Sequence, residues 1–302
     1  GAFYNNADIY KINKHAIEGL SFKNHKVRSL DQSRIGPILN NEVSSLKGGP
    51  KVKALFIQNT NPLVVAPETI KVRKGFKRKD LFVCVHEQFM TETAKYADVL
   101  LPATSFVEHD DIYVSGGHQH LSYGPKLIKN IGNSWSNNKL INELGKALGS
   151  KNRCFKLDEK SLIDITLKKS NLGSFNGIKK KNFLDLQPSF RDSHFLNGFG
   201  HKDGKFHFSP NWKNGNAKFN TKYNLPNHYD LIEKSTSKCP YKLVTAPAHN
   251  FLNSSFTELD TSKKKEKKPT IKINPKDLQK LKCISDDIVL IGNKRGSLRI
   301  PC

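Results

Sequence analysis

The fold is decided first by residues 52–62, VKALFIQNTNP, in which an apolar run of strand length ends in a polar turn. A second apolar run follows at residues 81–85, and residues 67–76 between the two can form a helix whose first turn accepts proline. Strand, helix and strand in this order predict a βαβ unit, with both strands buried in a parallel sheet.

The pattern continues beyond this unit. Residues 91–97 predict a short helix and residues 99–102 a third strand. Residues 137–148 predict an amphipathic helix, because Leu140, Ile141, Leu144 and Leu148 share one face and Gly149 ends it. We therefore expect residues 50–150 to form one α/β domain.

The flanking segments differ in composition. Residues 1–49 are polar and predict an irregular lead-in, and residues 151–238 predict a connecting region with a helix at 161–169. Residues 239–302 are expected to form a further domain, with short strands predicted at 241–245, 270–273, 288–291 and 297–300 and a helix at 274–281. Strands at this spacing indicate a barrel or a sandwich.

Length and composition exclude several classes of protein. At 302 residues the chain has room for two domains, since domains usually hold about 100–200 residues. Its apolar runs are too short for a membrane span. The five cysteines are scattered without a C-x-x-C pair, which argues against disulfides and cysteine-built metal sites and predicts a reducing, cytoplasmic location.

The net charge of +23 raises the hypothesis of a nucleic-acid partner. Most of the excess is lysine spread along the whole chain, with no aromatic and basic residues interleaved as in RNA-binding proteins. A well-solvated, lysine-rich surface is the favoured interpretation.

Both ends indicate breaks in a longer protein. The chain starts at Gly1 without an initiator Met or a targeting signal. It stops at Cys302 directly after two predicted strands, which would leave a sheet with an open edge.

Polar side chains follow the predicted strands at the points where the strands end. In an open α/β sheet, ligands bind at the carboxyl ends of the strands. Asn59 and Asn61 offer donors and acceptors together, which suits a pterin or guanine edge. The spacing alone favours a simpler account, in which both side chains satisfy the backbone of the turn.

Four motifs in order add a second line of argument: NP at 61–62, the strand at 81–85, FMTETA at 89–94 and ADVLLP at 97–102, with Glu108 after them. Together they resemble the molybdopterin oxidoreductase family, the dimethyl sulfoxide reductase and formate dehydrogenase group, and most of all its bacterial members of the biotin sulfoxide reductase type. LVTAP at 243–247, NSS at 253–255 and INPKD at 273–277 are similar to the family's dinucleotide-binding domain.

The resemblance implies an α/β fold class: a Rossmann-like parallel-sheet cofactor domain followed by an incomplete double-psi β-barrel domain. It implies a two-electron or oxygen-atom-transfer oxidoreductase acting on a small molecule, with an unknown electron-transfer partner. The implied cofactor is molybdenum with molybdopterin guanine dinucleotide. Relatives often carry a [4Fe–4S] cluster upstream, which we expect to lie outside this chain if it is present.

By the same resemblance, two groups of residues would bind the cofactor. The first lies in the α/β domain and comprises Asn59, Asn61, Pro62, His86, Glu87, Thr91 and Asp98. The second lies in the barrel domain and comprises Thr245, Ala246, Pro247, Asn253 and Ser254.

This chain departs from the family pattern in two places. At 245–247 it lacks the arginine of a Thr-Gly-Arg-like turn, and at 108–120 it has extra imidazoles and carboxylates. His109, Asp110, Asp111, His118 and His120 have the chemistry of metal ligands, but we expect them to line the cofactor pocket or substrate funnel. The family's molybdenum ligand lies upstream, so no residue here is named as catalytic.

Two alternatives remain open. One is a structural relative that binds no molybdopterin, such as the large peripheral subunit of respiratory complex I, in which the motifs would persist for packing. The other is a basic nucleic-acid-binding protein, whose affinity would fall steeply with salt.

Overall fold

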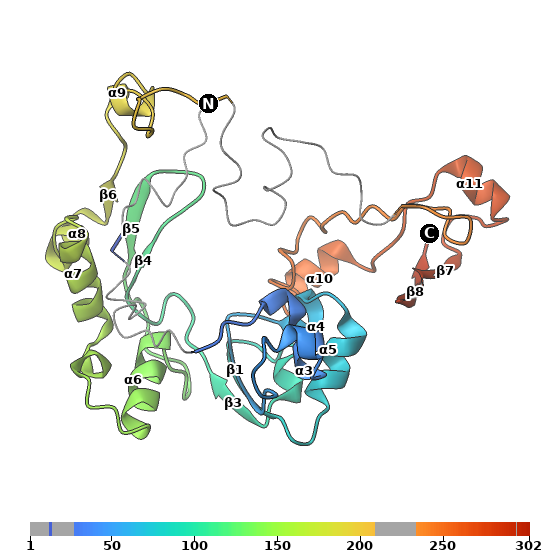
Figure 1. The fold of residues 1–302 in the computed structure, drawn as a ribbon, viewed down its shortest axis with the longest axis horizontal. Helices are drawn as coiled ribbons and strands as arrows, with labels where there is room; N and C mark the ends of the chain where they lie inside the picture. Colours follow the sequence, from blue (N-terminus) through green and yellow to red (C-terminus); the bar gives the residue numbers. More distant parts are fainter. Residues whose placement is uncertain (1–11, 14–26, 209–233, 294) are drawn as a thin grey trace. The chain divides into compact units, whose positions relative to one another are not determined.

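The computed structural model describes residues 12–13, 27–208, 234–293 and 295–302 (Figure 1). The chain divides into two compact units, each described by itself. Among the described residues, the larger unit comprises residues 12–13, 27–112, 123–182, 245–293 and 295–302, and the smaller comprises residues 113–122, 183–208 and 234–244.

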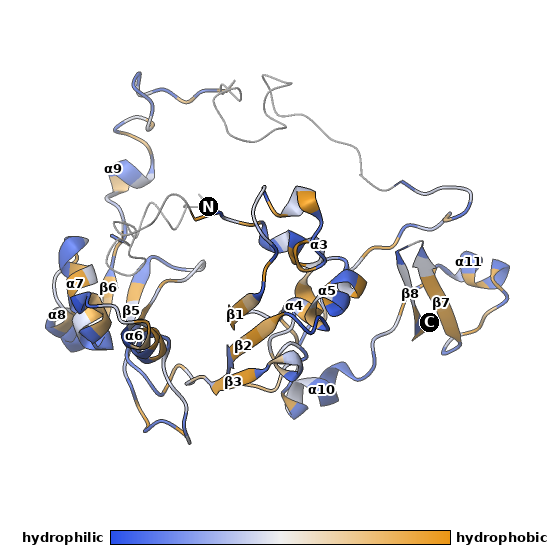
Figure 2. Ribbon diagram, turned by 60° about the horizontal axis from the view of Figure 1, so that its bottom comes forward, coloured by the Kyte–Doolittle hydropathy of each residue, from blue (hydrophilic) through white to orange (hydrophobic). Residues whose placement is uncertain are grey.

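The larger unit contains the predicted parallel sheet. Its strands are β1 (Ala54–Gln58), β2 (Phe82–Glu87) and β3 (Val99–Pro102), in the order β1-β2-β3, and both pairings are parallel. Figure 2 shows these strands largely in hydrophobic colours. The structure therefore confirms the α/β class and the three strands of residues 50–102.

Helices α3 (Ile35–Leu39), α4 (Pro62–Val65) and α5 (Thr69–Phe76) pack with the strands around one core. Pro62 occupies the first turn of α4, where no helical hydrogen bond needs its missing N–H. The helix expected at 67–76 begins at Thr69, after Glu68 in a left-handed conformation. The core residues are Leu39, Ile57, Leu63, Val72, Phe76, Leu81, Val83, Val85 and Ala94.

Part of the segment expected to be irregular is folded. It contains α3 and the short 3₁₀ helices η2 (Gln32–Arg34) and η3 (Val43–Ser45). Leu39 has 0% of its surface exposed, and its side chain lies against Gly75 of α5, where a larger residue would have no room. The apolar stretch of α3 is too short to show a helical period, which is why the sequence pattern missed it.

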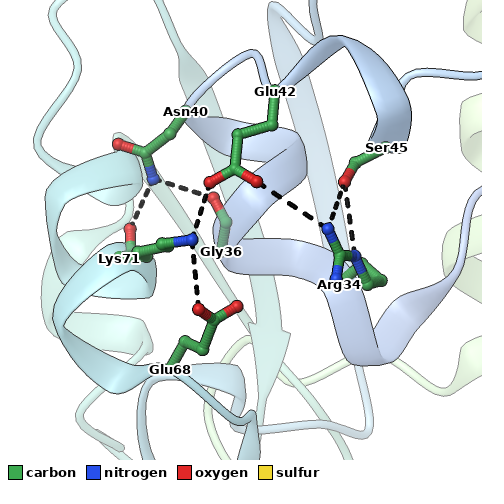
Figure 3. A network of polar contacts seen from close by, with 7 residues as sticks. All are labelled: Arg34, Gly36, Asn40, Glu42, Ser45, Glu68 and Lys71. Carbon is green, nitrogen blue, oxygen red and sulfur yellow. Dashed lines mark hydrogen bonds and ion pairs between the residues drawn. The ribbon is translucent and has the colours of Figure 1, made fainter. Parts of the chain in front are cut away.

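A polar network also joins α3 to α5 (Figure 3). The Glu42 carboxylate lies 2.8 Å from Lys71 Nζ and 3.7 Å from an Arg34 nitrogen, and Lys71 also lies 3.1 Å from Glu68. The hydrogen bonds that the Lys71 ammonium donates to the Glu42 and Glu68 carboxylates raise the pKa of Lys71. Because these side chains are partly exposed, water screens the ion pairs and the buried Leu39 contact contributes more stability.

Residues 137–181 of the larger unit are mainly helical. They contain α6 (Asn137–Ala147), η5 (Arg153–Lys156), α7 (Glu159–Lys169) and α8 (Phe175–Lys181). Ser136, Asp158 and Ser174 cap α6, α7 and α8 by accepting hydrogen bonds from the first-turn backbone. The helices predicted at 137–148 and 161–169 are confirmed, whereas α8 was not predicted.

Strands β4 (Asp111–Tyr113), β5 (His120–Gly124) and β6 (Phe183–Asp185) were not predicted either. In the smaller unit, residues 120–122 of β5 pair with β6 in an antiparallel register. Helix α9 (Phe190–Ser193) follows β6.

Towards the C-terminus, α10 (Asp260–Glu266), α11 (Pro275–Lys280) and the antiparallel hairpin of β7 (Ile288–Asn293) and β8 (Gly296–Pro301) are formed. The helix at 274–281 and the last two strands are confirmed. The strands predicted at 241–245 and 270–273 are wrong: no described strand pairs with them, and a single backbone bond from Ile271 N to Pro301 O (2.9 Å) is formed instead. The incomplete double-psi β-barrel stays a prediction.

No helix in the described part of the chain combines the length and the apolar character needed to cross a membrane.

Replacing Leu39 by Ala should lower the free energy of unfolding by about 2–5 kcal/mol, because the change leaves a cavity against α5. Urea denaturation followed by circular dichroism measures this loss. Val43→Ala is the matched control, since Val43 belongs to the same segment but is exposed. Equal midpoints for the two variants would show that α3 is not part of the core.

Candidate functional site

The carboxyl ends of the three parallel strands lie at one edge of the sheet, which we call the carboxyl edge. It comprises the strand ends Gln58, Glu87 and Pro102 and the turns that follow them. Asn59 turns the backbone directly after β1, with a φ of 54°, a left-handed conformation that asparagine tolerates. This edge is where open α/β sheets bind ligands.

Asn61 joins the turn after β1 to the turn after β2. Its Oδ1 accepts hydrogen bonds from Thr93 Oγ1 (2.7 Å) and Thr93 N (3.3 Å), and Thr93 Oγ1 accepts one from Leu63 N (3.1 Å). Asn61 is only 5% exposed and Thr93 is fully buried. Asn61 and Pro62 are therefore buried residues that fix the conformation of the turn.

His86 occupies the centre of the carboxyl edge and is 1% exposed. Gln58 Nε2 lies 2.9 Å from His86 Nδ1, and His86 Nε2 lies 3.1 Å from the Trp135 carbonyl oxygen. An amide nitrogen donates and a carbonyl oxygen accepts, so both ring nitrogens of His86 are engaged by neighbouring protein groups.

The N-terminus of α6 completes this edge. Gln58 Nε2 also donates to Asn137 Oδ1 (3.0 Å), and Trp135 N donates to Pro102 O (3.0 Å) while Trp135 O accepts from Thr104 N (3.1 Å). Sequence reasoning did not assign Gln58, Trp135 or Asn137 to a site. Gln58 could have been found from its place at the end of a strand, but no sequence signal connects it to Asn137.

The structure separates the remaining predicted residues of this domain. Asn59 is exposed and Glu87 is half-buried at the carboxyl edge, whereas Thr91 is buried and its Oγ1 accepts from Ala94 N (3.1 Å) at η4 (Ala94–Tyr96). Asp98 lies at the opposite, amino end of the sheet, where its Oδ2 accepts from Val83 N (2.7 Å). Asn59 and Glu87 are thus the two predicted residues available to a ligand there.

The five predicted residues of the C-terminal part lie in two local stretches. Thr245, Ala246 and Pro247 are exposed in a segment without regular structure. Asn253, with a φ of 54°, and Ser254 form a turn closed by hydrogen bonds between Leu252 and Ser255 (2.8 and 3.2 Å). Whether either stretch contacts a cofactor stays a prediction.

Glu108 ends the motif that follows β3 and is buried. Its carboxylate accepts from Ser105 N (2.6 Å), Ile131 N (2.6 Å) and Ser134 Oγ (3.1 Å). The backbone hydrogen bonds to Ser105 and Ile131 hold the pKa of Glu108 below its usual range, although burial opposes them. The charged carboxylate of Glu108 therefore holds the loop between β3 and α6 in place.

The acidic and imidazole side chains beside Glu108 also contact other residues of the protein. Asp110 accepts a hydrogen bond from the Tyr123 hydroxyl, and burial together with this contact raises the pKa of Tyr123 to about 12. His109 Nδ1 lies 3.0 Å from Thr104 Oγ1, and His109 Nε2 lies 3.9 Å from Asp111. Among the described residues, no group of three His, Cys, Asp or Glu side chains could hold a metal ion.

Comparison with known proteins identifies the class. Residues 5–147 match the family model described as molybdopterin oxidoreductase, so the chain carries a domain of the molybdopterin oxidoreductase family, as its motifs predicted.

Two relatives illustrate the similarity. The chain is 32% identical to the probable oxidoreductase YoaE of Bacillus subtilis, over 99% of this chain and 43% of YoaE. It is 27% identical to the F420-dependent formate dehydrogenase subunit alpha of Methanocaldococcus jannaschii, over 83% of this chain and 36% of that subunit. The chain thus spans less than half the length of these relatives.

A solved structure shows the same fold. Acetylene hydratase from Pelobacter acetylenicus superposes with a TM-score of 0.67 at 19% identity, over 88% of this chain and 36% of that enzyme.

Replacing Glu108 by Gln should make unfolding less sensitive to acid. Because folding lowers the pKa of Glu108 below the usual 4.5, its carboxylate stabilises the fold above that pH, and this stability is lost as the pH falls through the lowered pKa. Above pH 5 the variant should lose about 1–3 kcal/mol, since Gln keeps one acceptor but not the charge.

Urea midpoints between pH 3 and pH 7 check this expectation. The difference between Glu108→Gln and the unmodified chain should shrink toward pH 3. A difference in urea midpoint that does not change with pH would mean that the charge of Glu108 does not stabilise the loop.

Proposed function

We propose that this chain is part of an oxidoreductase that carries molybdenum with molybdopterin guanine dinucleotide. The observation that carries the proposal is the gathering of polar side chains at the carboxyl edge of a sheet that belongs to the molybdopterin oxidoreductase family. The relatives named as oxidoreductases support the reaction class.

The groups at this edge fit such a ligand. The exposed amide of Asn59 can donate and accept, and the carboxylate of Glu87 can accept from the amino group of a pterin or guanine ring. Asn61 and His86 are committed to protein partners, so they hold the turns in place. When bound, the molybdenum cofactor supplies two-electron redox chemistry; the protein binds and orients it.

Further parts of the function rest on the resemblance. We propose that Thr245, Ala246, Pro247, Asn253 and Ser254 contribute a second wall for the dinucleotide, within a double-psi barrel completed by a longer chain. A small-molecule substrate, an electron-transfer partner, a [4Fe–4S] cluster upstream and a cytoplasmic location are expectations of the same kind.

A non-catalytic structural relative is the second candidate. One observation favours it: Asn61, His86 and Thr91 are buried and hydrogen-bonded within the protein, so they need no ligand. The two candidates differ in one measurable respect, which is whether the protein retains molybdenum.

The test uses the protein that contains this chain, purified from cells supplied with molybdate. Elemental analysis should find stoichiometric molybdenum, and denaturation should release the fluorescent pterin and guanine nucleotide. The double variant Asn59→Ala, Glu87→Gln should lower the molybdenum content, because affinity falls about tenfold for each 1.4 kcal/mol of lost interaction.

Glu68→Gln is the matched control, since Glu68 directly precedes α5 and forms a partly exposed ion pair with Lys71. It should leave the molybdenum content unchanged. Absence of both molybdenum and pterin from the unmodified protein would sink the cofactor proposal and favour the structural relative.

A further inference from the structure

Gln58 and His86 are paired residues at the ends of the two strands that lead to the proposed cofactor site. The register of β1 with β2 sets Gln58 opposite His86, and Gln58 Nε2 lies 2.9 Å from His86 Nδ1. The next residue on each strand end, Asn59 after Gln58 and Glu87 after His86, is one of the two groups that remain available to a ligand. One side-chain contact therefore joins the strand ends that carry both of these groups.

This contact lies in a part of the carboxyl edge that is largely shielded from water. His86 is 1% exposed and Gln58 is half-buried. A hydrogen bond in such surroundings matters more than one at the surface, because a buried polar atom that loses its partner cannot bind water instead. Within the described part of the chain, Gln58 provides the side-chain partner of His86 Nδ1.

The turn that carries Asn59 is held at both of its ends. On one side Gln58 is fixed by strand pairing and by its amide, and on the other Asn61 Oδ1 accepts from Thr93 Oγ1 (2.7 Å). Asn59 itself has a φ of 54°, a conformation that persists where the surrounding structure holds it. The position of the Asn59 side chain thus depends on the contacts of its neighbours.

A second contact of the same amide reaches the start of α6. Gln58 Nε2 donates to Asn137 Oδ1 (3.0 Å), and an amide NH₂ group has two N–H donors, so it can serve both partners at once. Asn137 is exposed, and water can replace it as a partner at small cost. The contact with His86 is therefore the more important of the two.

We propose that Gln58 is a positioning residue for the cofactor site at the carboxyl edge. Its contact with His86 fixes the separation between Asn59 and Glu87, so that both groups can meet one ligand without rearrangement. A ligand that finds its partners in place loses less free energy to ordering them, and small displacements of such groups weaken binding. Gln58 acts through Asn59 and Glu87 and needs no contact with the ligand itself.

This inference rests on the proposed function and adds a residue to it. Asn59 and Glu87 are the groups proposed to contact the cofactor, whereas Gln58 sets how firmly they hold it. Loss of Gln58 should therefore speed the release of the cofactor.

The test uses the protein that contains this chain, purified from cells supplied with molybdate. Elemental analysis of samples desalted at intervals gives the rate at which molybdenum leaves the protein. Gln58→Leu keeps the size of the side chain but removes its amide, and it should raise this rate about fivefold or more. Gln58→Asn keeps the amide on a shorter side chain that does not reach His86, so it should also raise the rate and carries the test if Gln58→Leu does not fold. Asn137→Ala should have a smaller effect than Gln58→Leu.

Two controls separate positioning from a general loss of stability. Asn142→Leu removes another part-buried amide, which donates to the Leu157 carbonyl oxygen (2.8 Å) and is not part of the carboxyl edge. Leu39→Ala destabilises the core beneath α5. Both variants should release molybdenum as slowly as the unmodified protein.

A double-mutant cycle gives a readout that a merely structural role of Gln58 would not move. Because Gln58 acts through Asn59, the combination of Gln58→Leu with Asn59→Ala should raise the release rate by less than the product of the two single effects.

Three results overturn the positioning role while leaving the cofactor proposal intact. They are unchanged release from both Gln58 variants, equally fast release from either control, and single effects that simply multiply in the double variant. Absence of molybdenum and pterin from the unmodified protein is a different outcome, which overturns the proposed function and this inference with it.

Discussion

Parallel pairing of β1, β2 and β3 is the constraint on which the rest of the structure depends. Parallel strands run in one direction, so the three chain segments that leave them emerge at the same edge. Each strand must be followed by a return connection, and α4 with α5 provides the first of these. The core of Leu39, Val72, Phe76 and Val85 holds that connection against the sheet. The position of every group at the carboxyl edge follows from this arrangement.

The polar groups at that edge serve two purposes. Asn61 and His86 satisfy neighbouring backbone and side-chain groups, and a buried polar group without such partners would be costly. Their contacts fix the turns on which Asn59 and Glu87 are placed. A site whose supporting residues are already hydrogen-bonded loses little conformational freedom when a ligand arrives. The saturation of Asn61 and His86 is therefore compatible with a binding role for their neighbours.

The sequence predicted the parts of the fold that have strong local patterns. The three parallel strands and α6 were found because apolar runs and an amphipathic period mark them. Helix α3 was missed because five residues are too few to show a period. The prediction of strands at 241–245 and 270–273 was wrong for another reason. A strand forms only where a second strand pairs with it, and an apolar run does not show which segment that is. Within the site, the motifs led to Asn61 and His86 but not to Gln58 or Asn137, whose contact joins residues 79 positions apart.

The same difference in sequence separation bears on how the molecule acquires its shape. The sheet and its helices are encoded without interruption by residues 35–102, so their contacts close short loops and can form early. The Gln58–Asn137 hydrogen bond closes a much longer loop, and it can form only after α6 has docked. Regions with few buried apolar contacts are the ones that open locally in the native state. Hydrogen exchange should then distinguish a slowly exchanging core in β2 from a faster N-terminal turn of α6.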